Sequence, residues 1–234
     1  MVERRRMHNG PSVKENTVRG PEWYTYTAGA RFYDTLSGER LIYRAGRVAG
    51  IRLLQPRPGG VVLDLGCGTG LNFPLLAAAV GPSGLVIGLD RSPEMLTVAR
   101  RRVTRDRLHM VRLLEADAAS FDTHTVNALI RQTGREPGVD AVLATYSMSV
   151  FSNWRAAWQA SLAVLKHPGR AAIVDMQSTT GRAIILSPLA HLACLLGGSD
   201  IQAHPWVAVG VGCTDVVVET LRGGHIVAAA GTCP

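Results

Sequence analysis

The stretch VVLDLGCGTG, residues 61–70, joins a run of apolar residues to three glycines at alternate positions. The apolar run predicts a buried strand, and Gly66, Gly68 and Gly70 stand where the chain turns into the next helix. Glycine lets the backbone approach a ligand closely and adopt dihedral angles that a side chain forbids. The spacing differs from the Gly-x-Gly-x-x-Gly of dinucleotide-binding loops, and no Lys-Ser or Lys-Thr follows as in a phosphate-binding P-loop. We therefore expect a ligand-binding loop of a third kind, with a ligand-free turn as the alternative.

Short β-rich runs alternate with helical segments from this loop onward. The expected strands are Val61–Leu65, Leu85–Asp90, Met110–Asp117, Asp140–Tyr146, Ala171–Asp175, Asp215–Leu221 and His225–Ala230. The expected helices are Leu71–Val80, Ser92–Arg105, Thr125–Arg131, Trp154–Lys166 and the apolar Arg182–Leu196. Alternating units predict a parallel sheet with helices on both faces, and Arg222-Gly223-Gly224 predicts a hairpin between the last two strands. The expected fold class is α/β: a Rossmann-like, doubly wound, mostly parallel seven-stranded sheet with an antiparallel C-terminal hairpin strand.

Three segments are expected along the 234 residues. Residues 1–20 are polar, basic and interrupted by two Gly-Pro pairs, which is typical of a flexible arm. Residues 21–58 carry apolar residues at helical spacing and are expected to form an N-terminal helical lid. Residues 59–234 are expected to form the ligand-binding domain, because this length suits one hydrophobic core.

The composition argues against a membrane-spanning or secreted protein. No run approaches the ~18–20 uninterrupted apolar residues that a spanning helix requires. The N-terminal MVERRR has no apolar run behind it, so a secretory signal is not expected and the cytoplasm is the expected location. The four cysteines, Cys67, Cys194, Cys213 and Cys233, are far apart in the sequence, which predicts reduced thiols with neither a disulfide framework nor a metal site.

The formal net charge of +7 raises the question of an anionic partner. The runs Arg4–Arg6 and Arg100–Arg102 are not interleaved with aromatic residues. We interpret them as a solvated tail and a solvated helix face, with RNA or an anionic membrane surface as alternatives.

Acidic residues end three successive predicted strands. Asp64 closes the first, Asp90 closes the second twenty residues after Gly70, and Asp117 closes the third. A carboxylate in the position of Asp90 can accept hydrogen bonds from both hydroxyls of a ribose. Because the carboxyl ends of parallel strands meet at one edge, the ligand is expected there.

VLDLGCGTG resembles the first signature of the class I S-adenosylmethionine-dependent methyltransferases. The resemblance is close over residues 61–121 and looser to Asp175. It implies that the glycine loop passes under the methionine part of the cofactor and that Asp64 contacts its amino group, often through water. It also implies that Asp117 and the amide of Ala118 bind the adenine. The predicted cofactor-binding residues are Asp64, Gly66, Cys67, Gly68, Gly70, Asp90, Arg91, Asp117, Ala118 and Thr145.

Two further segments bear on the methyl acceptor. The segment at the end of the fourth strand, residues 144–149, lacks the Asn/Asp-Pro-Pro-Tyr/Phe motif of enzymes that methylate nucleic-acid amino groups, which disfavours nucleic acid. RFYDTLSGERLIYR and VFSNWRAAWQASLAVLK are similar to small bacterial methyltransferases that N-methylate phosphatidylethanolamine or diacylglyceryl-homoserine. The chain departs from that pattern at Lys166–Arg170, where Pro-Gly-Gly is usual, and from Ala183 onward.

The predicted catalytic residues are Tyr33, Tyr146 and Asp175. A phenol oxygen or ring face receives a polar or cationic nitrogen, and Asp175 ends the fifth strand at the expected edge. Packing in the core is the alternative for each tyrosine. His124, His191 and His204 are weaker candidates for a general base.

The sequence supports three functional hypotheses. The first is S-adenosylmethionine-dependent N-methylation of a lipid or small-molecule amine, releasing S-adenosylhomocysteine. The second is O- or C-methylation of a soluble metabolite, and the third is cofactor binding without catalysis. A lipid acceptor would add peripheral contact with the inner membrane face through Arg4–Arg6 and the apolar Ala183–Leu196. The sequence does not decide the acceptor, the number of methyl groups, the oligomeric state or the role of residues 183–214.

Overall fold

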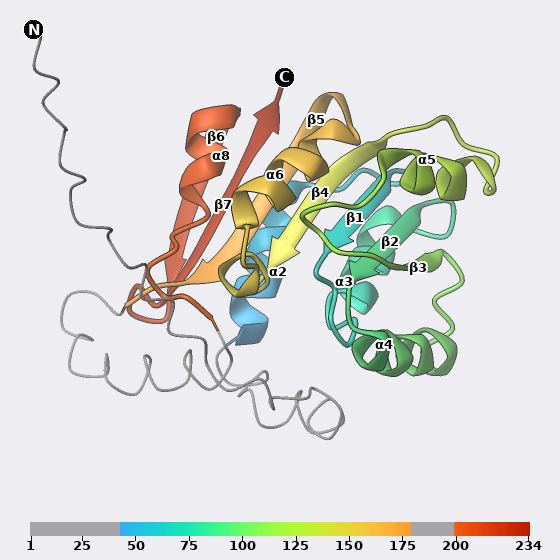
Figure 1. The fold of residues 1–234 in the computed structure, drawn as a ribbon, viewed down its shortest axis with the longest axis horizontal. Coiled ribbons are helices and arrows are strands. Elements are labelled where there is room, and N and C mark those ends of the chain that lie inside the picture. Colours follow the sequence, from blue (N-terminus) through green and yellow to red (C-terminus); the bar gives the residue numbers. More distant parts are fainter. Residues whose placement is uncertain (1–42, 179–198) are drawn as a thin grey trace, which may run out of the picture.

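The computed structural model describes residues 43–178 and 199–234 (Figure 1). Seven strands form one sheet: β1 (Val61–Leu65), β2 (Leu85–Asp90), β3 (Val111–Glu115), β4 (Val139–Thr145), β5 (Leu165–Met176), β6 (Thr214–Leu221) and β7 (Ile226–Cys233). Their order is β3-β2-β1-β4-β5-β7-β6. The first five strands are parallel, and β7 runs antiparallel to both β5 and β6. The predicted fold class is confirmed, and the one antiparallel strand lies between β5 and β6 instead of at the edge.

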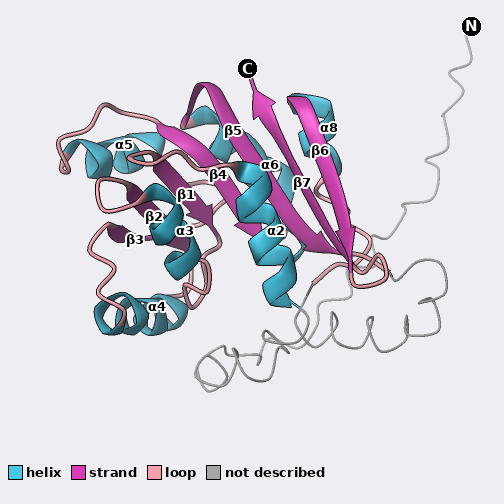
Figure 2. Cartoon of the chain, turned by 180° about the vertical axis from the view of Figure 1, so that it is seen from behind, coloured by secondary structure: helices cyan, strands magenta, loops and turns pink. Residues whose placement is uncertain are grey.

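Helices cover both faces of the sheet (Figures 1 and 2). One core cluster joins α2 (Arg44–Leu54), α3 (Phe73–Val80) and α4 (Pro93–Arg105) to one face. A second cluster joins α5 (Thr123–Arg131), α6 (Trp154–Ala163) and α8 (Val207–Gly212) to the other face. Strands β1, β2 and β4 are therefore buried on both sides, which explains their nearly continuous apolar runs, whereas the edge strand β3 is partly exposed.

Some element boundaries differ from the expected ones. Strand β3 ends at Glu115, which pairs with Asp90 at the end of β2, two residues before the predicted end. Strand β5 begins at Leu165 because helix α6 ends at Ala163, earlier than predicted. Helix α8 was not predicted, and the predicted helix Arg182–Leu196 lies entirely outside the described residues. Within the described ranges, no helix is long and apolar enough to cross a bilayer.

Helix α2 is the described part of the predicted N-terminal lid. It packs on β4, β5 and β7, and its C-terminal residue Leu54 is fully buried. Two of its glycines allow this close approach: a Cβ on Gly50 would lie 2.3 Å from the side chain of Val174. The rest of the predicted lid, residues 21–42, lies outside the described residues.

The prediction that all four cysteines are reduced is wrong. Cys213 and Cys233 form a disulfide, with their Cα atoms 4.2 Å apart. The antiparallel register pairs Thr214 with Thr232, so the next residue on each strand is a cysteine. A spacing of twenty residues gives no such signal until the two strands are paired. Cys67 is a free, buried thiol, and Cys194 lies outside the described residues.

Candidate active site

The glycine loop leaves β1 at the carboxyl edge of the sheet. Gly66, Gly68 and Gly70 all have φ between 54° and 77°, in the left-handed region that favours glycine. The amides of Gly66 and Cys67 both donate to the carbonyl of Leu89, which fixes the loop against β2. A Cβ on Gly66 would lie 2.6 Å from Ser147, whereas a Cβ on Gly68 would meet no atom within 4 Å. Open space therefore lies over Gly68, where a ligand can approach the backbone.

A cavity of about 430 Å³ opens beside the loop. This volume falls within the range of roughly 300–1,000 Å³ typical of small-molecule sites. Seven predicted site residues line it: Gly66, Gly68, Asp90, Arg91, Asp117, Ala118 and Tyr146. They come from the ends of β1, β2, β3 and β4, as expected for the carboxyl edge of an α/β sheet.

Asp90 links the cavity wall to the glycine loop. Its Oδ2 accepts a hydrogen bond of 2.8 Å from the amide of Gly68, and its Oδ1 accepts one of 2.9 Å from the amide of Ser92. Burial raises the pKa of this carboxyl group, and the two amides oppose that effect. A carboxylate held from two sides in this way is preorganised to accept further hydrogen bonds from a ligand.

Asp117 and Ala118 form the wall that continues β3. The Oδ1 of Asp117 accepts a hydrogen bond of 2.8 Å from the amide of Ala119, and the side chain is exposed. Ala118 is buried beside it. The turn therefore places the Asp117 carboxylate and the neighbouring residue Ala118 side by side in the cavity wall, an arrangement that suits a planar heterocycle.

Asp64 lies below the loop in a buried polar network and does not line the cavity. Its Oδ1 accepts a hydrogen bond of 2.8 Å from Asn72, which also donates to the hydroxyl of Thr145 at 2.9 Å. Arg47 of α2 donates to Asn72 at 3.2 Å and to Thr145 at 2.8 Å. Within the described residues, the Oδ2 of Asp64 has no partner. Burial raises the pKa of Asp64 to about 7, although Asn72 and Arg47 both lower it.

Sequence reasoning missed Arg47 and Asn72. Asn72 follows Gly70 by two residues, so its position between the loop and helix α3 gave a weak signal. Arg47 lies 98 residues from Thr145 along the chain, and only the packing of α2 on the sheet brings them together. The predicted residues Cys67 and Thr145 are buried behind the cavity, and burial raises the pKa of the Cys67 thiol well above its usual value.

Tyr146 lines the cavity, and its hydroxyl and ring both contact residues at the start of α2 and just before it. The residue has φ of 56°, and its amide donates to the carbonyl of Val174. Its hydroxyl donates to the carbonyl of Tyr43 at 2.9 Å, and the two rings meet edge to face at 5.0 Å. The guanidinium of Arg47 lies 5.1 Å from the centre of the Tyr146 ring.

Asp175 is fully buried and does not line the cavity. Its carboxylate accepts hydrogen bonds from the hydroxyl and amide of Ser149, at 2.7 Å and 2.9 Å, and from the amide of Met176. Burial raises the pKa of Asp175 to about 6 against these hydrogen bonds. Tyr33, the third predicted catalytic residue, lies outside the described residues, as does His191. His124 is exposed, and His204 lines a separate cavity between α6 and α8.

His225 stands at the same edge and was not among the predicted residues. Its ring is buried, its Nδ1 lies 2.7 Å from the carbonyl of Gln177, and its centre lies 6.3 Å from that of Tyr43. Met176 and Ile201 complete a small apolar cluster with the two tyrosines. His225 reaches this position because β7, which follows it, pairs with β5. The sequence around His225 does not predict that pairing.

The part of the chain that holds the glycine loop is similar in sequence to known methyltransferases. Residues 62–169 match the model of a family described as a methyltransferase domain. The chain is 29% identical over 151 residues to an arsenite methyltransferase of Halobacterium salinarum, covering 62% of this chain and 35% of that protein. It is 39% identical over 85 residues to a demethylmenaquinone methyltransferase of Bacillus cytotoxicus, covering 36% of each. The chain thus spans little more than a third of the length of these two relatives.

Solved structures share the architecture at low identity. A methyltransferase of Aquifex aeolicus dependent on S-adenosylmethionine aligns with a TM-score of 0.60 at 17% identity, covering 89% of this chain and 98% of that one. A phosphoethanolamine N-methyltransferase of Haemonchus contortus, solved with phosphomonomethylethanolamine and S-adenosylhomocysteine, aligns with a TM-score of 0.61 at 21% identity. That alignment covers 83% of this chain and 43% of that one. The fold is the class I methyltransferase fold.

The residues around the glycine loop suit S-adenosylmethionine as the cofactor. The match to a methyltransferase domain and the neighbour solved with S-adenosylhomocysteine support the same cofactor. Three observations of the site agree with it. Space over Gly68 admits a ligand against the backbone, Asp90 is a preorganised acceptor at the cavity wall, and Asp64 keeps a buried oxygen without a described partner.

Proposed function

We propose that the chain is a methyltransferase that uses S-adenosylmethionine and transfers the methyl group to a lipid or small-molecule amine. The observation that carries the proposal is the cavity at the carboxyl edge, where the open position over Gly68 and the fixed carboxylate of Asp90 meet. When bound, the cofactor supplies a methyl group attached to a cationic sulfur leaving group. The protein's contribution is to hold the acceptor in line with that methyl group.

In this proposal, different residues at the carboxyl edge of the sheet bind different parts of the cofactor. Asp90 accepts hydrogen bonds from the ribose hydroxyls, and Asp117 with the Ala118 amide binds the adenine, with Arg91 beside it. Asp64, oriented by Asn72, receives the cationic amino group, directly or through water. Its oxygen without a described partner supports this role, because a buried acceptor without a partner is costly unless a ligand satisfies it.

The acceptor is assigned to the aromatic side of the cavity. Tyr146 supplies a ring face there, and we retain Tyr33 as the second acceptor-site residue. The Haemonchus contortus neighbour was solved with an amine, whereas the other two relatives are named for chemically different acceptors, arsenite and demethylmenaquinone. Asp175 has three internal hydrogen bonds, which suit positioning the Ser147–Ser149 turn better than removing a proton.

A second candidate is an acceptor that loses a proton from oxygen or carbon. It rests on His225, whose buried ring lies 6.3 Å from that of Tyr43 and is not part of the lining of the cavity. With a proton on Nδ1 donated to the carbonyl of Gln177, the Nε2 of the ring is left as the proton acceptor. A quinol or phenol would then be methylated with His225 as the base.

A methyl-transfer assay with labelled S-adenosylmethionine tests both candidates. The panel contains phosphoethanolamine, phosphatidylethanolamine in vesicles, a demethylnaphthoquinol and arsenite, with Asp90→Ala as the control of weakened cofactor binding. Turnover on either amine supports the first candidate, and turnover on the quinol alone supports the second. Binding of S-adenosylhomocysteine with no turnover on any acceptor would contradict both and leave a binding module.

A further inference from the structure

Positive charge is concentrated in and around α4. Residues 91–112 contain seven arginines and two acids, a net charge of +5, in a chain whose formal net charge is +7. The arginines are Arg91, Arg100, Arg101, Arg102, Arg105, Arg107 and Arg112, and the acids are Glu94 and Asp106.

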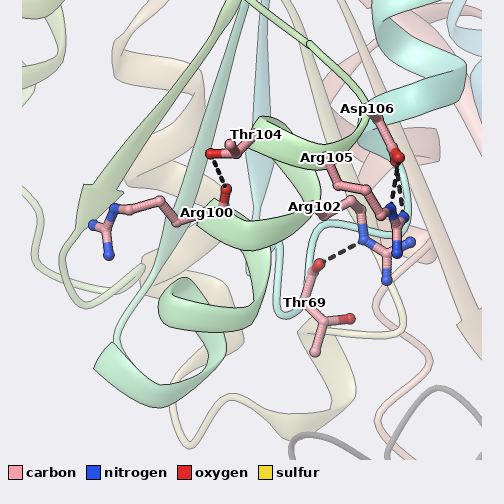
Figure 3. Close-up of polar contacts among 6 residues, drawn as sticks. All are labelled: Thr69, Arg100, Arg102, Thr104, Arg105 and Asp106. Carbon is pink, nitrogen blue, oxygen red and sulfur yellow. Dashed lines mark hydrogen bonds and ion pairs between the residues drawn. The ribbon is translucent and has the colours of Figure 1, made fainter.

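Two of these arginines serve the fold (Figure 3). Arg102 donates from Nε to the carbonyl of Thr69 in the glycine loop at 2.9 Å, which ties α4 to the cofactor site. Arg105 forms two hydrogen bonds with Asp106, at 2.7 Å and 2.9 Å, and lowers the pKa of that carboxyl group. These contacts account for Arg102 and Arg105 without any partner from outside.

For Arg100 and Arg101, no comparable side-chain contact is seen among the described residues. Both side chains are exposed, and no described residue forms an ion pair with either. Figure 3 shows the Arg100 guanidinium pointing away from the cluster of Arg102, Arg105 and Asp106. Two exposed cations next to each other repel, so this arrangement is one that an anion stabilises.

These two arginines, with Thr97, Thr104 and Arg105, line a hollow of about 470 Å³ on the surface of α4, which we name the arginine face. Both threonine hydroxyls donate to carbonyls of the helix itself, at 2.9 Å and 3.1 Å. The guanidinium groups are therefore the donors that remain for a ligand. Their planar, forked geometry matches the oxygens of a phosphate group.

We infer that the arginine face docks the protein on the phosphate head groups of an anionic lipid bilayer. The arginine face is lined by no aromatic side chain on which a nucleic-acid base could stack, so the bilayer is favoured over single-stranded nucleic acid. Pro93, Glu94 and Met95 in the first turn of α4 line the cofactor cavity. Contact through the next turns therefore holds the cavity close to the lipid surface, whichever acceptor the enzyme uses.

Vesicle binding tests this inference without any methyl acceptor. The probes are vesicles of phosphatidylglycerol with phosphatidylcholine, vesicles of phosphatidylcholine alone, and a single-stranded RNA, each at low and high salt. The full chain is compared with Arg100→Gln/Arg101→Gln and with Arg57→Gln/Arg131→Gln, which removes the same charge from exposed positions elsewhere. Unfolding temperature and S-adenosylhomocysteine binding report on the fold of each variant.

We expect salt-sensitive binding to the anionic vesicles only, weakened about tenfold or more by Arg100→Gln/Arg101→Gln and changed little by the control pair. Equal loss in the control pair would overturn the inference, because net charge alone would then explain binding. Equal binding to neutral and anionic vesicles, or binding to RNA and to no vesicle, would also overturn it. So would a loss of vesicle binding seen only in a variant with Arg4–Arg6 replaced by glutamine.

Discussion

Asp64 couples the stability of the fold to the site. The side chain is fully buried, one oxygen is bonded to Asn72, and the other has no described partner. Burial raises its pKa to about 7 from an ordinary value of 3.8. A carboxyl group whose pKa is higher in the folded state stabilises the fold below its unfolded pKa, and this contribution is lost as the pH rises through the folded value.

Asp64→Asn should remove this pH dependence. The free energy of unfolding of the wild type, minus that of the variant, is expected to fall by a few kcal/mol between about pH 4 and pH 7. Asp175 titrates in the same sense but is present in both proteins, so its effect cancels in the difference. Chemical denaturation across this pH range is the measurement, and a difference that stays constant with pH would contradict the assigned pKa.

Asp90→Ala should weaken S-adenosylhomocysteine binding at least about tenfold. The variant loses a charged acceptor of ribose hydrogen bonds, each worth roughly 1.5–3 kcal/mol, and about 1.4 kcal/mol corresponds to one decade. The matched control is Asp122→Ala, since Asp122 also accepts a backbone amide bond, from His124 at the start of α5, and does not line the cavity. Calorimetric titration that gave both variants the wild-type affinity would mean that the ribose binds elsewhere.

At the scale of elements, helix α2 packs against Tyr146, a residue that lines the cavity, at the position of Gly46. A Cβ on Gly46 would lie 2.0 Å from the hydroxyl oxygen of Tyr146 and 2.8 Å from Ile226. Tyr146 lines the cavity, so the packing of α2 against its side chain bears on part of the site.

Gly46→Ala should destabilise the protein by about 1–3 kcal/mol because it overpacks this contact. Gly210→Ala in α8 is the control, since its Cβ would meet nothing within 4 Å. That change should be neutral or stabilising by up to about 1 kcal/mol, because alanine is the better helix former. Thermal and urea unfolding of the two variants measure this, and equal effects would show that Gly46 is not a packing position.

The β6–β7 pair is closed by the disulfide between Cys213 and Cys233. Cys213→Ser/Cys233→Ser should lower the free energy of unfolding by about 2–4 kcal/mol, since it opens a loop of this length in the unfolded chain. The affinity for S-adenosylhomocysteine should not change, because neither residue lines the cavity. A reductant is the companion test: it should destabilise the wild type and leave the double variant unaffected. A wild type indifferent to reductant would contradict the disulfide.

At the scale of the whole molecule, regular alternation was enough to predict the sheet and its binding edge. The glycine loop and the acids Asp90 and Asp117 were placed correctly at that edge because strand ends are local features of the sequence. The sequence could not place what depends on distant pairing. Arg47 reaches Thr145 only through the packing of α2, and His225 reaches Tyr43 only because β7 lies beside β5. The buried positions of Asp64 and Asp175 also follow from tertiary packing, since both residues end predicted strands as Asp90 does.

In the proposed function the space over Gly68 receives the cofactor, and one titration tests this most directly. S-adenosylhomocysteine is titrated calorimetrically into the wild type, Gly68→Val and Gly134→Val. Both glycines have positive φ, of 54° and 74°, and a Cβ on either would meet no protein atom within 4 Å. The backbone strain of about 1–2 kcal/mol is therefore shared, while only Gly68 lines the cavity. We predict wild-type affinity for folded Gly134→Val and no measurable binding for folded Gly68→Val; wild-type affinity in Gly68→Val would contradict the claim.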